Sequence, residues 1–148
     1  MVLVQRGRGF FKLMEVKFQY RFAYNSEIGK IYRPQAEVFL TSPKTDLQAN
    51  TWMIIDSGAD HSILPKFLAE KLGISLNTEC DSQETSGVGG KQIIYFYPKK
   101  LKIKIGEANL SVPFWFFDNN NVPPLLGRYG FLDEVDVCFK NREVIFNF

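Results

Sequence analysis

One stretch of the sequence combines residue types that can transfer protons with residue types that turn the chain sharply. The apolar run 51–55 leads directly into Asp56, Ser57 and Gly58. A carboxylate at the end of a buried strand is unfavourable unless it is solvated, paired or retained for chemistry. Gly58 permits a tight turn and the close approach of a bound chain, and the Ser57 hydroxyl can hold the loop. The triplet alone is also ordinary turn composition, so Asp56 is a candidate acid–base group that needs support elsewhere in the sequence.

A glycine-rich segment follows further along the chain. Gly87, Val88, Gly89 and Gly90 precede residues 92–97, whose composition predicts a strand. This pattern favours the tip of a mobile hairpin. A phosphate-binding loop is the alternative, but such a loop carries Gly-Lys-Ser/Thr and leads into a helix, whereas this segment leads into a strand.

A third segment places an apolar pair, Leu125 and Leu126, before Gly127 and Arg128. Residues 131–133 follow as a candidate short helix. The order of the acid triplet, the glycine-rich tip and the Gly-Arg turn is more specific than any of the three alone.

Together these segments resemble the retropepsin family of aspartic peptidases. Subunits of that family carry an apolar-Asp-Ser/Thr-Gly-Ala motif, a glycine-rich flap and an apolar-apolar-Gly-Arg motif before a short helix. The resemblance covers residues 35–148. It implies a mostly β fold, a closed β-barrel of the retropepsin type, with one short helix after the active-site loop and one near the C-terminal half.

The resemblance also assigns roles to individual residues. It makes Asp56 the catalytic residue and pairs Asp60 with Arg128, and charge-assisted hydrogen bonds between these two would stiffen the site. Ser57 would brace the two active-site loops of a dimer against each other. Five residues would support the active-site loop in all: Ser57, Gly58, Ala59, Asp60 and Arg128.

Two further groups take their roles from the same resemblance. Gly87, Val88, Gly89 and Gly90 would form the flap over the substrate. Asn147 and Phe148 would belong to a terminal strand that interdigitates with its twin in the dimer interface. Tyr129 and the long region before residue 35 depart from the retroviral pattern, which points to a non-viral-looking member.

The implied function is an aspartic endopeptidase that acts as a homodimer. Because the chain carries one Asp-Ser-Gly sequence, two copies would pair their Asp56 carboxylates and activate a water molecule. The substrate would be a peptide or protein in extended conformation, with no cofactor. Two alternatives stay open: a noncatalytic retropepsin-like module for dimerisation or peptide binding, and an unrelated β-barrel binding domain.

Hydrophobic periodicity predicts the elements that position these residues. Residues 14–22 alternate as a half-buried strand, and residues 65–72 have helical spacing with Pro65 at the start and Gly73 at the stop. Residues 1–13 show no such pattern and are expected to form a flexible N-terminal arm, with 14–148 as a single domain. Further strands are expected at 36–40, 51–55, 92–97, 100–105, 110–117, 136–140 and 143–148.

Composition excludes several classes of function. The net charge of +2 over 148 residues, with signs mixed along the chain, argues against a nucleic-acid partner. His61 is the only histidine, so no histidine-based metal site is expected, and Cys80 and Cys138 are expected to be reduced, buried thiols. The sequence has neither the apolar stretch of a signal peptide nor one long enough for a membrane span, which predicts a cytoplasmic protein without a membrane partner.

Overall fold

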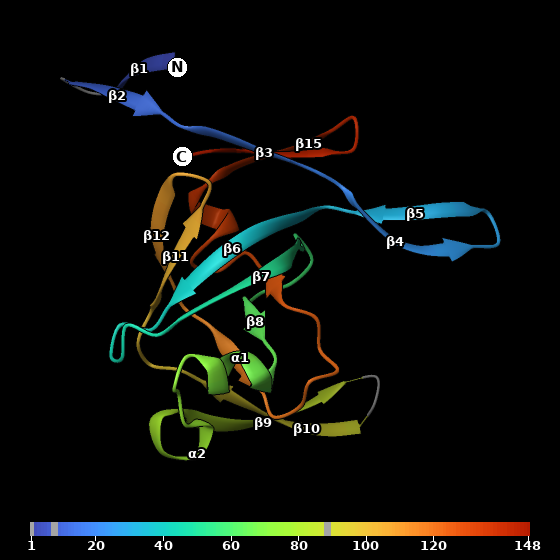
Figure 1. The fold of residues 1–148 in the computed structure, drawn as a ribbon, viewed down its shortest axis with the longest axis vertical. Coiled ribbons are helices and arrows are strands. Elements are labelled where there is room, and N and C mark those ends of the chain that lie inside the picture. Colours follow the sequence, from blue (N-terminus) through green and yellow to red (C-terminus); the bar gives the residue numbers. More distant parts are fainter. Residues whose placement is uncertain (1, 7–8, 88–89) are drawn as a thin grey trace.

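The computed structural model describes residues 2–6, 9–87 and 90–148, and its regular structure is mostly β, as predicted (Figure 1). The largest sheet has nine strands. Their spatial order is β12 (Ala108–Val112), β11 (Leu101–Ile105), β6 (Gln35–Thr41), β7 (Gln48–Ile55), β14 (Leu125–Leu126), β8 (Ile63–Leu64), β13 (Trp115–Phe117), β10 (Gly90–Phe96) and β9 (Asp81–Gly87).

This sheet is open, so the predicted closed β-barrel is wrong for the described residues. Its two edge strands are β12 and β9, which are not paired with each other. The reason is that β9 and β10 form a hairpin whose outer residues are exposed, and this hairpin pairs with the rest of the sheet only where β10 meets β13. The edge strand β9 therefore ends in solvent instead of closing against β12.

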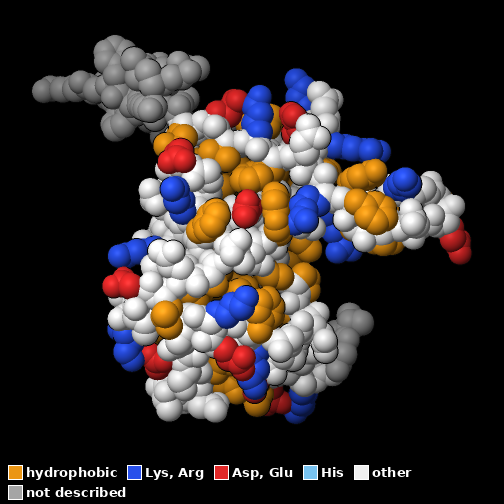
Figure 2. All heavy atoms as spheres, viewed as in Figure 1, with side chains coloured by type: hydrophobic (Ala, Val, Ile, Leu, Met, Phe, Trp, Pro, Cys, Tyr) orange, Lys and Arg blue, Asp and Glu red, His pale blue; other side chains and the backbone are white. Residues whose placement is uncertain are grey.

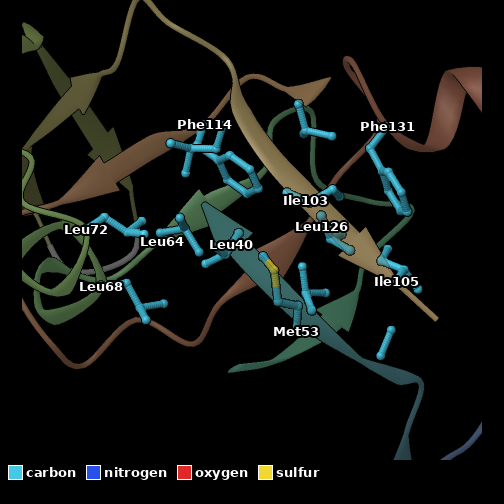
Figure 3. Packing of buried hydrophobic residues seen from close by; sticks show 14 of the residues in the cluster. Leu40, Met53, Leu64, Leu68, Leu72, Ile103, Ile105, Phe114, Leu126 and Phe131 are labelled. Atoms are coloured by element: carbon cyan, nitrogen blue, oxygen red, sulfur yellow. The ribbon is translucent and has the colours of Figure 1, made fainter. Parts of the chain in front are cut away.

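The core lies on the inner face of this sheet, where alternate strand residues point inward. In β11, for example, Leu101, Ile103 and Ile105 are buried while the lysines between them are exposed. Figure 3 shows side chains from the sheet meeting those of the helix that follows β8; the labelled set includes Leu40, Met53, Leu64, Leu68, Leu72, Phe114 and Leu126. Each such buried side chain contributes about 1.5–3 kcal/mol relative to exposure.

The predicted helix after the active-site loop is α1 (Lys66–Lys71), and it stops where Gly73 takes the left-handed conformation at φ +67°. Its start is capped from elsewhere in the chain: the Phe67 N–H donates to the Asn120 side chain at 2.8 Å. Lys66 and Asp118 form an ion pair of 2.8 Å that holds the same loop. The hydrogen bond between these two side chains raises the pKa of the Lys66 ammonium. The loop 118–120 therefore fixes α1 beneath the sheet.

Two other helical turns are shorter. The α2 helix (Leu76–Glu79) lies in a segment where no helix is expected, and the helix expected near the C-terminal half is a single 3-10 turn, Leu132–Glu134. No helix in the described part of the chain is long and apolar enough to cross a membrane.

Three smaller sheets contain the remaining described strands. The C-terminal sheet has the order β15 (Asp136–Lys140), β16 (Glu143–Asn147) and β3 (Glu15–Gln19). The other two are hairpins: β4 (Arg21–Ser26) with β5 (Gly29–Arg33), and β1 (Val2–Arg6) with β2 (Gly9–Leu13). The strand expected at 14–22 is thus split at Tyr20, and the strand expected at 110–117 is split around Pro113, which has no N–H to donate. Separation of residues 1–13 from a domain at 14–148 stays a prediction.

Candidate active site

The strand order brings Asp56 and Gly127 together from distant parts of the sequence. Strands β7 and β14 are parallel neighbours, with Leu126 beside Ile55. The Asp56 N–H donates to the Leu126 carbonyl oxygen at 3.0 Å, so the pairing continues into the first residue of the loop. Because parallel neighbours end at the same edge of a sheet, the loop after β7 and the turn after β14 meet there.

The carboxylate of Asp56 is held by its own loop. Its Oδ1 atom accepts a hydrogen bond of 2.9 Å from the Gly58 N–H, and its main-chain oxygen accepts one of 3.2 Å from the Ala59 N–H. A side chain at position 58 would place its Cβ 3.2 Å from that Oδ1. Asp56 is half-buried, whereas Ser57 and Gly58 are exposed. The carboxylate is therefore fixed in direction while the loop around it faces solvent.

Arg128 holds this loop from the neighbouring turn. Its Nη1 atom donates to the main-chain oxygen of Ser57 at 2.6 Å, and its Nη2 atom contacts the carboxylate of Asp60. Two main-chain bonds of 2.9 Å join the same segments, from the Arg128 N–H to Ala59 and from the Tyr129 N–H to Asp60. The contact between Asp60 and Arg128 is the one expected from the sequence. The bond to Ser57 uses its carbonyl oxygen, whereas the sequence singled out its hydroxyl.

Two residues that were not predicted to belong to the site pack beneath the turn. The fully buried hydroxyl of Ser62 accepts a hydrogen bond of 3.0 Å from the Gly127 N–H. A Cβ atom at position 127 would lie 2.4 Å from the His61 carbonyl oxygen. The only signal for Ser62 in the sequence is its place in the polar run between Asp60 and the apolar pair that forms β8.

His61 links the loop to the strand β10 through a series of aromatic contacts. Its ring lies 5.5 Å from the ring of Trp115 and 5.9 Å from that of Tyr129, and Trp115 in turn lies 5.0 Å from Phe96 on β10. Among the described residues, no three His, Cys, Asp or Glu side chains gather closely enough to hold a metal ion.

The glycine-rich segment forms the end of the β9–β10 hairpin. Gly87 ends β9 and pairs with Gly90, which starts β10 at φ +93°. Val88 and Gly89 lie outside the described residues. The hairpin is connected to the Asp56 loop by a series of paired strands. Strand β10 pairs with β13, β13 pairs with β8, and β8 pairs with β14. A shallow hollow runs along the hairpin between residues of both strands, Ser82, Gln83, Glu84, Lys91, Gln92 and Ile93.

The end of the chain is paired on both sides within the same copy. Asn147 lies opposite Asp136 of β15 on one side and Glu15 of β3 on the other. The main chain of Phe148 exchanges hydrogen bonds of 2.9 and 3.2 Å with Met14. The expected interdigitation of this strand with its twin would need one of these strands to leave, because β16 has no open edge.

Comparison with known proteins agrees with this geometry. The sequence model of the aspartyl protease family matches residues 45–129, which is more than half of the chain and includes both loops described above. The fold is similar to the crystal structure of a retropepsin-like aspartic protease from Rickettsia conorii, with a TM-score of 0.60, 18% identity and coverage of 93% of each chain. No curated protein matches this chain.

Proposed function

Because this chain belongs to the aspartyl protease family, we propose that it is an endopeptidase whose active site forms between two copies, each contributing Asp56. One observation carries the proposal: the Asp56 carboxylate is held in direction by the Gly58 N–H while its loop faces solvent. The chain contains a single Asp-Ser-Gly sequence, so a symmetric pair of copies supplies the second carboxylate.

The chemistry of such a pair is general acid–base catalysis. Two carboxylates about 3 Å apart cannot both ionise, so they hold one proton between them. The ionised carboxylate takes a proton from water as the water oxygen attacks the peptide carbonyl carbon, and the protonated one gives its proton to the carbonyl oxygen. When the resulting diol collapses, the C–N bond breaks: the carboxyl group that took the water proton gives a proton to the amine nitrogen, and the other carboxylate takes the proton of a diol hydroxyl, so the pair again holds one proton.

The substrate in this proposal is a peptide in extended conformation. The β9–β10 hairpin acts as the flap, and its main chain would bind the substrate main chain as an added strand. Closure of the hairpin would exclude bulk water from the two Asp56 carboxylates. A cytoplasmic location and independence from any cofactor also stay predictions.

The second copy must approach through surfaces that one chain leaves open. In the C-terminal sheet the outer edges of β15 and β3 end the strand order, and such edges accept a strand from another chain. Asn147 and Phe148 would then support the interface from the central strand instead of pairing with their twins.

Cleavage of a peptide mixture, read by mass spectrometry, tests the catalytic role of Asp56. Asp56→Asn nearly keeps the shape of the side chain but cannot exchange the proton, so we expect no cleavage above background with an unchanged fold. Asp46→Asn is the matched control because it makes the same change at an exposed carboxylate in the loop before β7, at the opposite end of that strand from Asp56, and we expect it to retain cleavage. Equal turnover by Asp56→Asn and the parent would refute the assignment.

Dilution of the active protein tests the pairing. Specific activity should fall as the concentration drops below the dissociation constant of the dimer, and sedimentation should show the monomer appearing over the same range. A fully active monomer would contradict the two-copy site. A stable dimer without cleavage of any peptide would favour the noncatalytic module.

A further inference from the structure

A two-stranded hairpin projects from the body beside the Asp56 loop. Strands β4 and β5 pair with each other and with no other described strand, and Figure 1 shows them extending away from the nine-stranded sheet. We propose that this hairpin is a dimerisation arm that seats on the second copy at the rim of the shared active site. This inference rests on the proposed two-copy function, and it identifies β4 and β5 as part of the interface between the copies.

The root of the arm lies at the end of the strand that carries Asp56. The arm leads through Pro34 into β6, and the Pro34 carbonyl oxygen accepts a hydrogen bond of 2.9 Å from the Ile55 N–H. The first β6 residue, Gln35, is opposite Ile54 in the antiparallel register. The arm therefore leaves the body at the edge of the sheet where the Asp56 loop faces solvent, and a copy that supplies the second carboxylate must cover this edge.

Cation–π contacts fix the root to the body. The Arg21 guanidinium lies 4.1 Å from the ring of Trp52 on β7, and the Arg142 guanidinium lies 4.5 Å from the ring of Tyr32 on β5. Arg142 belongs to the turn between β15 and β16, so the arm is also attached to the C-terminal sheet. These contacts give the arm a fixed direction and join it to the sheet whose outer edges are open.

The outer part of the arm exposes apolar side chains. Phe22 is 52% exposed, Tyr24 is 48% exposed, and Ile28 in the turn at the tip is 95% exposed. Figure 2 shows hydrophobic and cationic side chains gathered on the projecting arm. An isolated two-stranded hairpin is marginally stable in water, and apolar groups clustered on one favour contact with another surface. The second copy is the occupant that the incomplete site requires.

The symmetry of a pair makes this contact sensitive to substitution. In an isologous dimer each arm touches the other copy, so one substitution removes two contacts. We expect Ile28→Asp to raise the dissociation constant of the dimer at least tenfold, measured by sedimentation in the Asp56→Asn background to prevent self-cleavage. Leu47→Asp is the control. Leu47 is likewise an exposed apolar residue, at 48%, but it lies in the loop at the other end of β6 and β7. It should change the constant less than twofold.

A second measurement guards against a folding defect. Amide hydrogen exchange in β4 and β5 should slow as the parent is concentrated through its dissociation constant, while thermal unfolding of dilute Ile28→Asp should match that of the dilute parent. An unchanged dissociation constant in Ile28→Asp would refute the dimerisation role of the arm. If Ile28→Asp in the active protein raised KM without changing dimerisation, the arm would instead bind substrate. A parent that stays monomeric at all concentrations would instead overturn the two-copy site itself.

Discussion

The guanidinium of Arg128 joins the carboxylate of Asp60 to the main-chain oxygen of Ser57, across a separation of 68 residues between Arg128 and Asp60. The side chain of Arg128 is 42% exposed and that of Asp60 is 76% exposed. An ion pair this open to water contributes only about 0.2–1 kcal/mol to stability. The value of the contact therefore lies in the position of the loop next to Asp56.

Replacing Arg128 should lower activity more than stability. Arg128→Ala should reduce turnover at least tenfold, because the loop loses its hold at both Ser57 and Asp60, while the free energy of unfolding falls by about 1 kcal/mol or less. Arg128→Lys should recover part of the turnover, since an ammonium cannot reproduce the planar fork. Lys104→Ala removes an exposed ion pair with Glu107 far from the site and is the control for both measurements. Parental turnover in Arg128→Ala would contradict the role.

Gly127 should tolerate no side chain. A Cβ atom there would lie 2.4 Å from the His61 carbonyl oxygen and 2.8 Å from that of Ala59, and both are main-chain atoms. Overpacking of this kind destabilises by about 1–3 kcal/mol or more, so Gly127→Ala should lower the midpoint of urea unfolding. Gly87→Ala is the comparison, because a Cβ atom at Gly87 meets nothing within 4 Å. Equal midpoints for the two variants would show that the turn can move aside.

The pH dependence of cleavage should report the shared proton. Two neighbouring carboxylates work only while they hold one proton between them, so the rate should fall both when a second proton binds and when the last one leaves. We expect a bell-shaped profile of kcat/KM with its maximum in mild acid. The Asp46→Asn variant, which removes an exposed carboxylate at the other end of β7, should keep the same shape. A rate that rises steadily to alkaline pH would point to a different catalytic group.

The two cysteines should differ in reactivity. Burial raises the pKa of the Cys80 thiol to about 11, with the nearby carboxylates of Glu79 and Asp81 adding to the effect. At pH 8 only about one thiol in a thousand at this position is ionised, and the thiolate is the reactive form. Iodoacetamide should therefore label the exposed Cys138 first, with single-cysteine variants to assign the labelled sites. Faster labelling of Cys80 would mean that its surroundings open in solution.

Exposure of Cys138 also corrects the expectation that both thiols are buried.

The sequence by itself determined the features that depend on neighbouring residues. Alternation in 36–40 and 100–105 predicted β6 and β11, and the helical spacing before Gly73 predicted α1, because the side chains of each segment face one core. The Asp-Ser-Gly sequence after a strand and the Gly-Arg turn likewise identified the loops that the structure brings together. These are local patterns, and a single segment is enough to read them.

Only the tertiary structure decided what depends on pairing between distant segments. The polar strand β9 has no apolar alternation and is a strand because it pairs with β10 along its whole length. The two-residue strands β8 and β14 are equally invisible in the sequence, yet the pairing of β14 with β7 is what places Arg128 beside Asp60. The open edge of the large sheet and the place of β16 between β15 and β3 could not be predicted either. Hydrogen bonds between strands join residues far apart in the chain, and no local pattern specifies which edges meet.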